Sequence, residues 1–303
     1  MATENPIPKP TPPSSLVRTL PRDIDAFLTH LNKALATPSG IDTVMLFLCY
    51  TSRLSSSLLT LLSQSLLRRS ARSWLGLLTT LPRGTTVLLT ETNKPPTSAA
   101  AAARAALVLA GRLKALSGLL SEARMILRLW ALLGMYFWAK GLVSKTLSSL
   151  SSSSEKSSKD KDTTKTTSKL ETALEYTRLT LCVALQALEN GAYLSQRGVL
   201  GWSPAKQGLA YKWSARFWAA YVGIEIGKLL AEGAAVRKEK QQPYEAKEKE
   251  TMEWRKKVAR NMAWMPLTIH WSTDSGIVNE PLVGLLASIP GIIQIRDLWA
   301  ETA

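Results

Sequence analysis

The side chains that could do covalent or metal chemistry are few and scattered in this sequence. His30 and His270 are the two histidines, and neither has a cysteine or carboxylate at metal-ligand spacing. Cys49 and Cys182 lie in separate apolar stretches, which predicts reduced, packed thiols rather than a disulfide framework. No nucleophile elbow, phosphate loop or dinucleotide fingerprint is present. We therefore expect a non-enzyme with no catalytic residues, cofactor or metal.

Three arginines offer a different chemistry, because guanidinium groups bind lipid phosphates. Plotted as a helix at about 100° per residue, residues 66–81 place Arg68, Arg69 and Arg72 opposite an apolar half. No Asp or Glu occurs over residues 43–90, so the polar half is purely cationic. Such a helix suits an anionic membrane surface; packing of its Leu face on neighbouring helices is the alternative. The predicted membrane-binding residues are Leu66, Leu67, Arg68, Arg69, Arg72, Trp74, Leu75, Leu77, Leu78 and Leu81.

A second membrane candidate is the charge-poor tract over residues 261–295, in which only Asp274 and Glu280 are charged. Small residues recur four apart within it, as in helices that pack closely in membranes. Its uncharged part has 15 residues, fewer than the roughly 20 of a standard span, and Pro290 is expected to kink it. A buried C-terminal helical hairpin is the alternative. The embedded candidates are Leu282, Val283, Gly284, Leu285, Leu286, Ala287, Ser288, Ile289, Gly291, Ile292 and Ile293.

The apolar, aromatic segment Leu129–Ala139 is too short to span a bilayer unaided. It inserts if Arg128 and Lys140 snorkel to the surface. Packing in a protein core is the alternative.

Composition predicts an all-α fold, because Leu, Ala and Ser dominate and β-branched alternation is scarce. We expect a Pro-rich disordered arm over 1–15 and a helical region over 16–143. A disordered Ser/Thr/Lys linker over 144–169 has nothing to bury, and a second helical region covers 170–303. The prediction is a membrane-associated helical protein of two halves joined by that linker.

Two local signals set helix boundaries in this interpretation. Asp42 is the predicted N-cap of a helix that runs to Leu62 or continuously to Leu81. Gly191 is the predicted end of a helix that begins at Leu170.

The net charge of +15 predicts attraction to polyanions. Zinc-finger spacing, an RNP-type motif and a basic heptad repeat are all missing from the sequence, which argues against nucleic acid. An anionic phospholipid membrane is therefore the predicted partner.

Three stretches appear in a characteristic order. Asp42 precedes Tyr50–Arg53, Glu122–Trp130 runs into Leu133-Gly134, and Pro266–Ser272 precedes Gly276 and the small-residue tract to Gly291. Together they resemble the peroxin-11 family of peroxisomal membrane elongation proteins, most closely its fungal C-type branch. The resemblance covers most of residues 20–300. The long Ala run and the Ser/Lys linker depart from the pattern.

The resemblance implies an all-helical, non-catalytic protein of the peroxisomal membrane. It also implies that an amphipathic helix inserts into and curves the membrane, a role that maps onto Leu66–Leu81. Self-association into a homo-oligomer and recruitment of fission machinery are further implications. We therefore expect a protein that elongates the membrane and promotes peroxisome division and proliferation. The alternative is a soluble helical adaptor that binds partner helices through its Leu-rich faces.

Overall fold

The computed structural model describes residues 16–80, 98–153, 162–236 and 244–303, and all regular secondary structure in them is helical. The all-α prediction is therefore confirmed. The Pro-rich arm predicted over 1–15 lies outside the described residues. The helices are α1 (Leu16–Ala34), α2 (Pro38–Thr80), α3 (Ser98–Arg128), α4 (Ala131–Ser153), α5 (Asp162–Gln196), α6 (Pro204–Val236), α7 (Tyr244–Ser272) and α8 (Glu280–Thr302).

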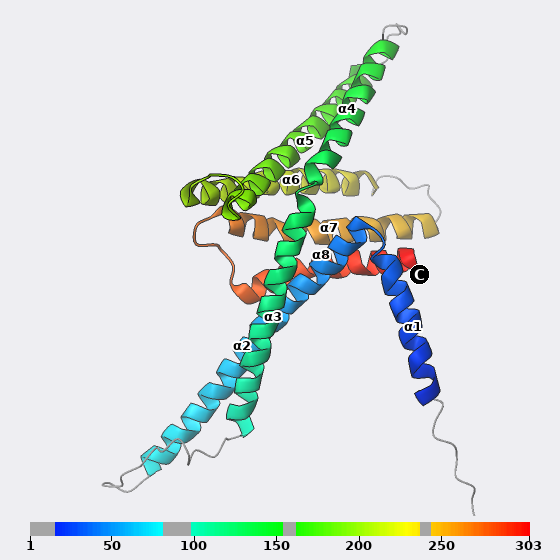
Figure 1. Cartoon of the computed structure of the whole chain (residues 1–303). Coiled ribbons are helices and arrows are strands. Elements are labelled where there is room, and N and C mark those ends of the chain that lie inside the picture. The colour runs from blue at the N-terminus through cyan, green and yellow to red at the C-terminus, as the bar shows by residue number, and fades with distance from the viewer. Residues whose placement is uncertain (1–15, 81–97, 154–161, 237–243) are drawn as a thin grey trace, which may run out of the picture.

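The helices form a central stack from which two hairpins project (Figure 1). Helices α6, α7 and α8 lie one above another in the stack. The hairpin of α2 and α3 extends to one side, and the hairpin of α4 and α5 extends to the opposite side. Helix α1 leaves the stack near the end of α8 and points to the same side as the α2/α3 hairpin. The fold is therefore elongated, with long helical surfaces outside the stack.

The core of the stack is small and aromatic. Leu267 of α7 and Val283 and Ala287 of α8 are almost fully buried. Trp218 of α6 stacks on Trp271 of α7, with ring centroids 5.6 Å apart. Aromatic rings therefore pack α6 against α7, and the small side chains Val283 and Ala287 allow α8 to pack closely against α7.

Small residues set the contact between α8 and α2. A Cβ placed on Gly284 would lie 2.9 Å from the Cα of Leu54, and one on Gly291 would lie 3.2 Å from the Cα of Phe47. Ala287 and Ser288 are buried on the same side of α8. Small residues four apart on a helix allow another helix to pack closely against it. Here the helix that packs against them is α2.

The two halves of the chain are interleaved. Helix α8 of the second half lies along α2 of the first, and α5 contacts both α3 and α4. The predicted linker over 144–169 is too long, because α4 continues through Ser153 and α5 already begins at Asp162. Residues 154–161 lie outside the described part.

Two predicted helix boundaries are wrong for identifiable reasons. Helix α2 begins at Pro38, so Asp42 lies inside it, and its carboxylate accepts a hydrogen bond of 2.8 Å from Arg124 Nε of α3. Helix α5 continues past Gly191 to Gln196. A Cβ on Gly191 would meet the Trp202 ring at 2.4 Å, so this glycine provides room for an indole and does not end the helix.

Candidate membrane interface

The part of the α2/α3 hairpin beyond α8 is called here the hairpin arm, comprising residues 58–80 and 98–110. Its register is set where Ser56 Oγ donates a hydrogen bond of 2.8 Å to the carbonyl of Ala110. Closer to the stack, Cys49 Sγ donates to the carbonyl of Ser117 at 3.4 Å. This antiparallel register places Ser98, the first residue of α3, about level with Arg68. The last three turns of α2 therefore extend beyond α3.

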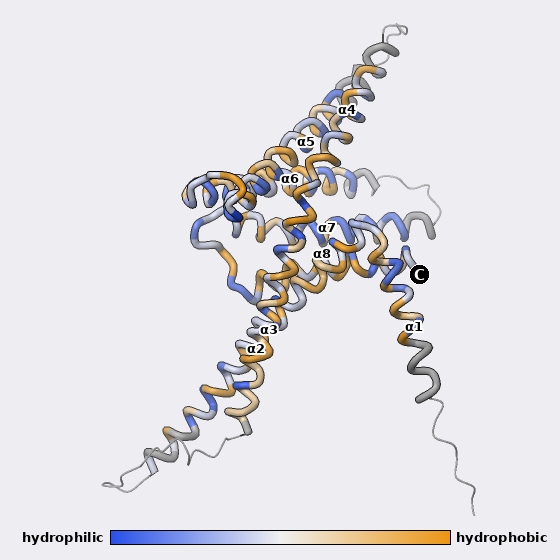
Figure 2. Tube along the Cα trace, in the orientation of Figure 1, coloured by the Kyte–Doolittle hydropathy of each residue, from blue (hydrophilic) through white to orange (hydrophobic). Residues whose placement is uncertain are grey.

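Large apolar side chains remain exposed along the hairpin arm. On α2, Leu58, Leu61 and Leu62 are 50–52% exposed, and Val108 of α3 is 57% exposed. Apolar residues recur on both helices of the arm (Figure 2). Leu58, Leu61 and Leu62 lie within about one turn of α2, and exposed apolar residues grouped in this way are typical of an interaction surface. The arm is therefore suited to contact lipid or another apolar surface.

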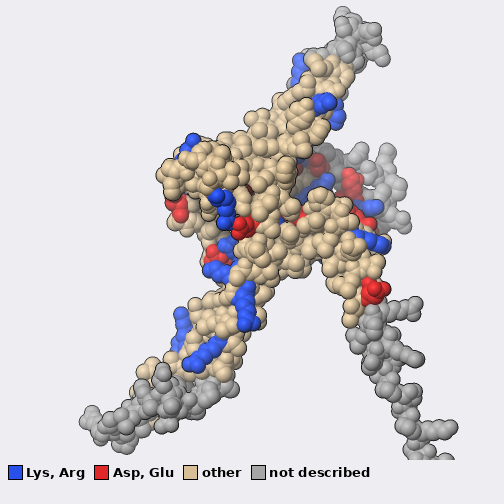
Figure 3. Space-filling model, viewed as in Figure 1, with Lys and Arg blue, Asp and Glu red and all other residues tan. Residues whose placement is uncertain are grey.

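All charged residues of the hairpin arm are cations. Arg68, Arg69, Arg72 and Arg104 are exposed, and none of them makes an ion pair with any residue that the structure describes. In Figure 3, blue side chains and no red ones lie on the visible face of the arm. Unpaired cations beside exposed leucines match a surface of apolar chains and phosphates.

The predicted amphipathic helix over 66–81 is the distal end of the 43-residue α2 and is not a separate element. Leu66 is half-buried, whereas Leu67 and Leu75 are exposed. The side chains of Trp74, Leu77, Leu78 and Leu81 lie outside the described part. The structure thus places the predicted arginines outward, on a helix that continues into the stack.

The charge-free band of α2 runs from Leu54 to Leu67. Its 14 residues measure about 21 Å along the helix axis. The hydrocarbon core of a bilayer is about 30 Å thick. On α3, Arg104 lies about level with Leu62 in the same band. The charge-free band of α2 is thus shorter than the hydrocarbon core, and the guanidinium of Arg104 lies within its length.

The candidate tract over 261–295 contains two helices and a loop. Its first part ends α7, where Ala263, Leu267 and Thr268 are buried in protein. Its second part lies in α8, which has one buried side and one exposed side. The side toward α2 is buried, whereas Leu285 and Ile292 are 49% and 42% exposed. A helical hairpin of α7 and α8 is present, and Met262 and Ile269 of α7 are exposed as well as the open side of α8.

Two of the described helices are long and apolar enough to cross a membrane, judged by length and composition. They are α2 over Pro38–Arg72 and α8 over Glu280–Thr302. The bent pair of Ala99–Arg128 and Ala131–Ser148 adds a third if it forms one broken span. The two single candidates are the helices that pack through Gly284 and Gly291.

The segment Leu129–Ala139 is not a core element. Trp130 is 75% exposed and Leu133, Tyr136 and Phe137 are 58–60% exposed. These side chains are exposed because α4 projects from the stack and packs along α5 in the α4/α5 hairpin. The core alternative for this segment is therefore wrong.

Helix α1 is an amphipathic helix that our sequence interpretation missed. It separates apolar from polar residues more sharply than any other described helix. Ile24, Phe27 and Leu28 are 52–54% exposed, although the Phe27 ring also lies 5.5 Å from that of Trp299. The three residues recur at a spacing of three or four, a signal that was available in the sequence.

The contact between α5 and α6, in contrast, has charges of both signs in pairs. Arg178 binds Glu225 and, at 2.6 Å, Glu175, which also accepts a hydrogen bond of 3.1 Å from Lys228. Burial opposes ionisation of Glu175, but the hydrogen bonds from Lys228 and Arg178 outweigh it and lower its pKa below the usual value. Such networks belong in an aqueous or protein environment. Lipid contact is therefore favoured at the hairpin arm and α1.

A polar cavity of about 640 Å³ lies between the stack and the base of the α2/α3 hairpin. Ion pairs cross it: Arg124 binds Asp42 at 2.8 Å, Arg128 binds Glu189 at 3.4 Å, and Arg197 binds Glu122. No group of three or more His, Cys, Asp or Glu in the described ranges is arranged to hold a metal ion. These ion pairs connect α3 with α2 and with the C-terminal end of α5 and the turn after it.

Comparison with known proteins gives one relative. The chain is 29% identical over 111 residues to the uncharacterized protein C1F12.04c of Schizosaccharomyces pombe. The match covers 36% of this chain and 51% of that protein, so the chain spans about half the length of the curated relative it matches. No family model matches the chain, and no solved structure matches it. The comparisons therefore establish similarity to this fission-yeast protein over about a third of the chain.

Proposed function

We propose that this protein is a peroxisomal membrane protein that remodels and elongates its membrane, and thereby promotes peroxisome division and proliferation. The observation that carries the proposal is the hairpin arm, which combines exposed leucines with unpaired cations and has no acidic residue. The organelle follows from the resemblance to the peroxin-11 family in the order of three sequence stretches.

The mechanism is a wedge in one leaflet. The charge-free band of α2 enters the acyl chains while Arg68, Arg69 and Arg72 bind lipid phosphates. Insertion on one side expands one leaflet only and favours positive curvature. Because the band is about 21 Å long, it displaces lipid without a stable span of the roughly 30 Å hydrocarbon core.

The exposed residues of the hairpin arm also indicate which partners the protein has in this proposal. An anionic phospholipid membrane satisfies both the leucines and the arginines of the arm. Self-association and recruitment of fission machinery are part of the proposal through the family resemblance. Chemical cross-linking of the full chain in vesicles is the direct test of the homo-oligomer.

Vesicle flotation tests the wedge. Leu62→Glu combined with Val108→Glu places one charge in the charge-free band of α2 and one beside that band on α3, and each acidic residue costs about 3 kcal/mol in a bilayer core. We expect this double variant to lose flotation with anionic vesicles while its circular dichroism in detergent is unchanged, because both side chains are exposed. Leu209→Glu with Leu230→Glu adds the same charges to exposed positions of α6 and should float normally.

One observation favours the soluble adaptor as a second candidate. The exposed aromatic residues of α4 form an apolar surface distant from the hairpin arm, and a partner helix can dock on such a surface. A wild-type chain that stays soluble and does not float supports the adaptor. Flotation that depends on Leu62 and Val108 supports the wedge.

A further inference from the structure

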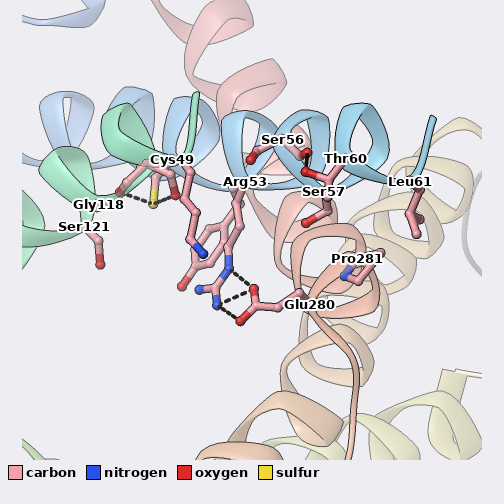
Figure 4. Close-up of a pocket in the computed structure, with 13 residues that line it drawn as sticks. Cys49, Arg53, Ser56, Ser57, Thr60, Leu61, Gly118, Ser121, Glu280 and Pro281 are labelled. Carbon is pink, nitrogen blue, oxygen red and sulfur yellow. Dashed lines mark hydrogen bonds and ion pairs between the residues drawn. The ribbon is translucent and has the colours of Figure 1, made fainter. Parts of the chain in front are cut away.

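A cavity of about 440 Å³ lies at the base of the hairpin arm, between α2, α3 and α8. Its volume is in the usual range for small-molecule sites, about 300–1,000 Å³. Figure 4 shows Arg53, Ser57 and Leu61 of α2 on one side and Glu280 and Pro281 of α8 on another. The cavity is named here the base pocket.

The base pocket has two cations and one carboxylate. Arg53 donates through Nε and Nη2 to Glu280 at 2.8–3.0 Å, which leaves its Nη1 outside this pairing. Lys114 of α3 also lines the pocket and makes no ion pair with the described residues. The Glu280 side chain is 65% exposed, so its carboxylate can accept further hydrogen bonds. Both signs of charge are thus available to one ligand.

The pocket also has an apolar end that continues into the hairpin arm. Leu61 lines the pocket and is 50% exposed, and Leu58 and Leu62 are exposed next to it. Serine and threonine hydroxyls, from Ser57, Thr60 and Ser121, also line the pocket. A ligand that fits has a charged head and a long apolar tail.

We propose that the base pocket binds a single glycerophospholipid whose headgroup carries a primary amine, as in phosphatidylethanolamine. The phosphate lies between Lys114 and Arg53, and the ammonium group donates to Glu280. The acyl chains leave past Leu61 along the hairpin arm. This inference rests on the proposed membrane function and adds the lipid class that the base pocket selects.

The Glu280 carboxylate is the reason for proposing a lipid whose headgroup carries a primary amine. A lipid with an anionic headgroup and no amine places negative charge near Glu280, which disfavours it. A quaternary choline ammonium has no N–H and cannot donate to the carboxylate. A primary ammonium satisfies Glu280 with charge-assisted hydrogen bonds, which are the stronger kind.

The test measures the thermal unfolding of the full chain in an uncharged detergent with added short-chain lipids. Dihexanoyl phosphatidylethanolamine should raise the midpoint at a concentration about tenfold lower than dihexanoyl phosphatidylcholine, the usual effect of a hydrogen bond to a charged group. Inorganic phosphate should have no effect at those concentrations. Equal responses to the two lipids, or the same response to phosphate alone, would overturn the proposal.

Variants locate the site. Lys114→Gln should weaken the response to the ethanolamine lipid about tenfold. Arg112→Gln removes an exposed cation two residues earlier that does not line the pocket, and should change nothing. Glu280→Gln should abolish the preference for ethanolamine over choline, whereas Glu280→Asp, which keeps the charge, should retain it. A preference that survives both Lys114→Gln and Glu280→Gln would also overturn the proposal.

Failure of this proposal is distinguishable from failure of the proposed function. Lys114→Gln should still float with vesicles of phosphatidylcholine and phosphatidylglycerol, because the arm is intact. Loss of wild-type flotation would contradict the wedge alone. Loss of the ethanolamine preference with normal flotation would contradict the base pocket alone.

Discussion

Gly284 of α8 lies directly against the backbone of Leu54 in α2, so that a Cβ on the glycine would come within 2.9 Å of both the Cα and the N of that leucine. The two helices that are apolar enough to cross a membrane therefore contact each other backbone to backbone. Arg53 and Glu280 close the same contact at its end. Helix α8 is thus held by α2 whatever surrounds them both.

Gly284→Ala should destabilise the protein, because the added methyl meets main-chain atoms that cannot rotate away. Overpacking of this kind costs about 1–3 kcal/mol. Gly227→Ala in α6 is the matched control, since its Cβ would meet nothing within 4 Å and alanine gains about 1 kcal/mol over glycine in a helix. Thermal unfolding in detergent measures both. A Gly284→Ala midpoint at or above wild type would show that α8 does not pack on α2 there.

Replacing Arg68, Arg69 and Arg72 with Glu should abolish binding to anionic vesicles. Each cation near such a surface contributes about 1 kcal/mol, and the substitution converts that attraction into repulsion. The wild-type affinity should also fall as salt rises, whereas the residual binding of the variant should not fall. Co-sedimentation over a salt series measures this. Salt-independent binding of the wild type would assign the affinity to the leucines alone.

Helix α1 should contribute a second membrane contact. Ile24→Glu with Leu28→Glu removes two exposed apolar side chains and should weaken vesicle binding about tenfold or more, since each contributes on the order of 1 kcal/mol when half-buried. Thr29→Glu with Asn32→Glu adds the same charge at exposed polar positions of this helix and is the control. Equal weakening by the two pairs would assign the effect to charge and not to α1 insertion.

Glu175 should make the contact between α5 and α6 sensitive to acid. Burial opposes its ionisation, but hydrogen bonds from Lys228 and Arg178 prevail and hold its pKa below the usual value of 4.5. A lowered pKa stabilises the fold above the unfolded-state pKa, and that stability is lost as pH falls through the folded-state pKa. Glu175→Gln should therefore lower the unfolding midpoint at pH 7 and flatten its decline below pH ~4.5. Glu171→Gln, an exposed carboxylate one turn earlier, should leave the profile unchanged.

Local pattern in the sequence was sufficient for the helical class and for several site features. Residues 66–81 show a cationic side, and the structure places Arg68, Arg69 and Arg72 outward, because helical periodicity depends only on nearby residues. The four-residue spacing of Gly284 and Ser288, and of Ala287 and Gly291, likewise indicated a close helix contact. The exposed apolar face of α1 was also within reach of the same periodicity, and was overlooked.

Only the tertiary structure decided which helices meet, because pairing joins residues far apart in the chain. Arg53 and Glu280 are 227 positions apart, and nothing local marks them as partners. Gly191 looks like a helix end until the Trp202 ring is seen against it. The sequence by itself determined helices, their apolar sides and the cationic bias of the arm. The packing of α8 on α2 decided which apolar side of each helix is buried, and it left the hairpin arm exposed beyond that contact.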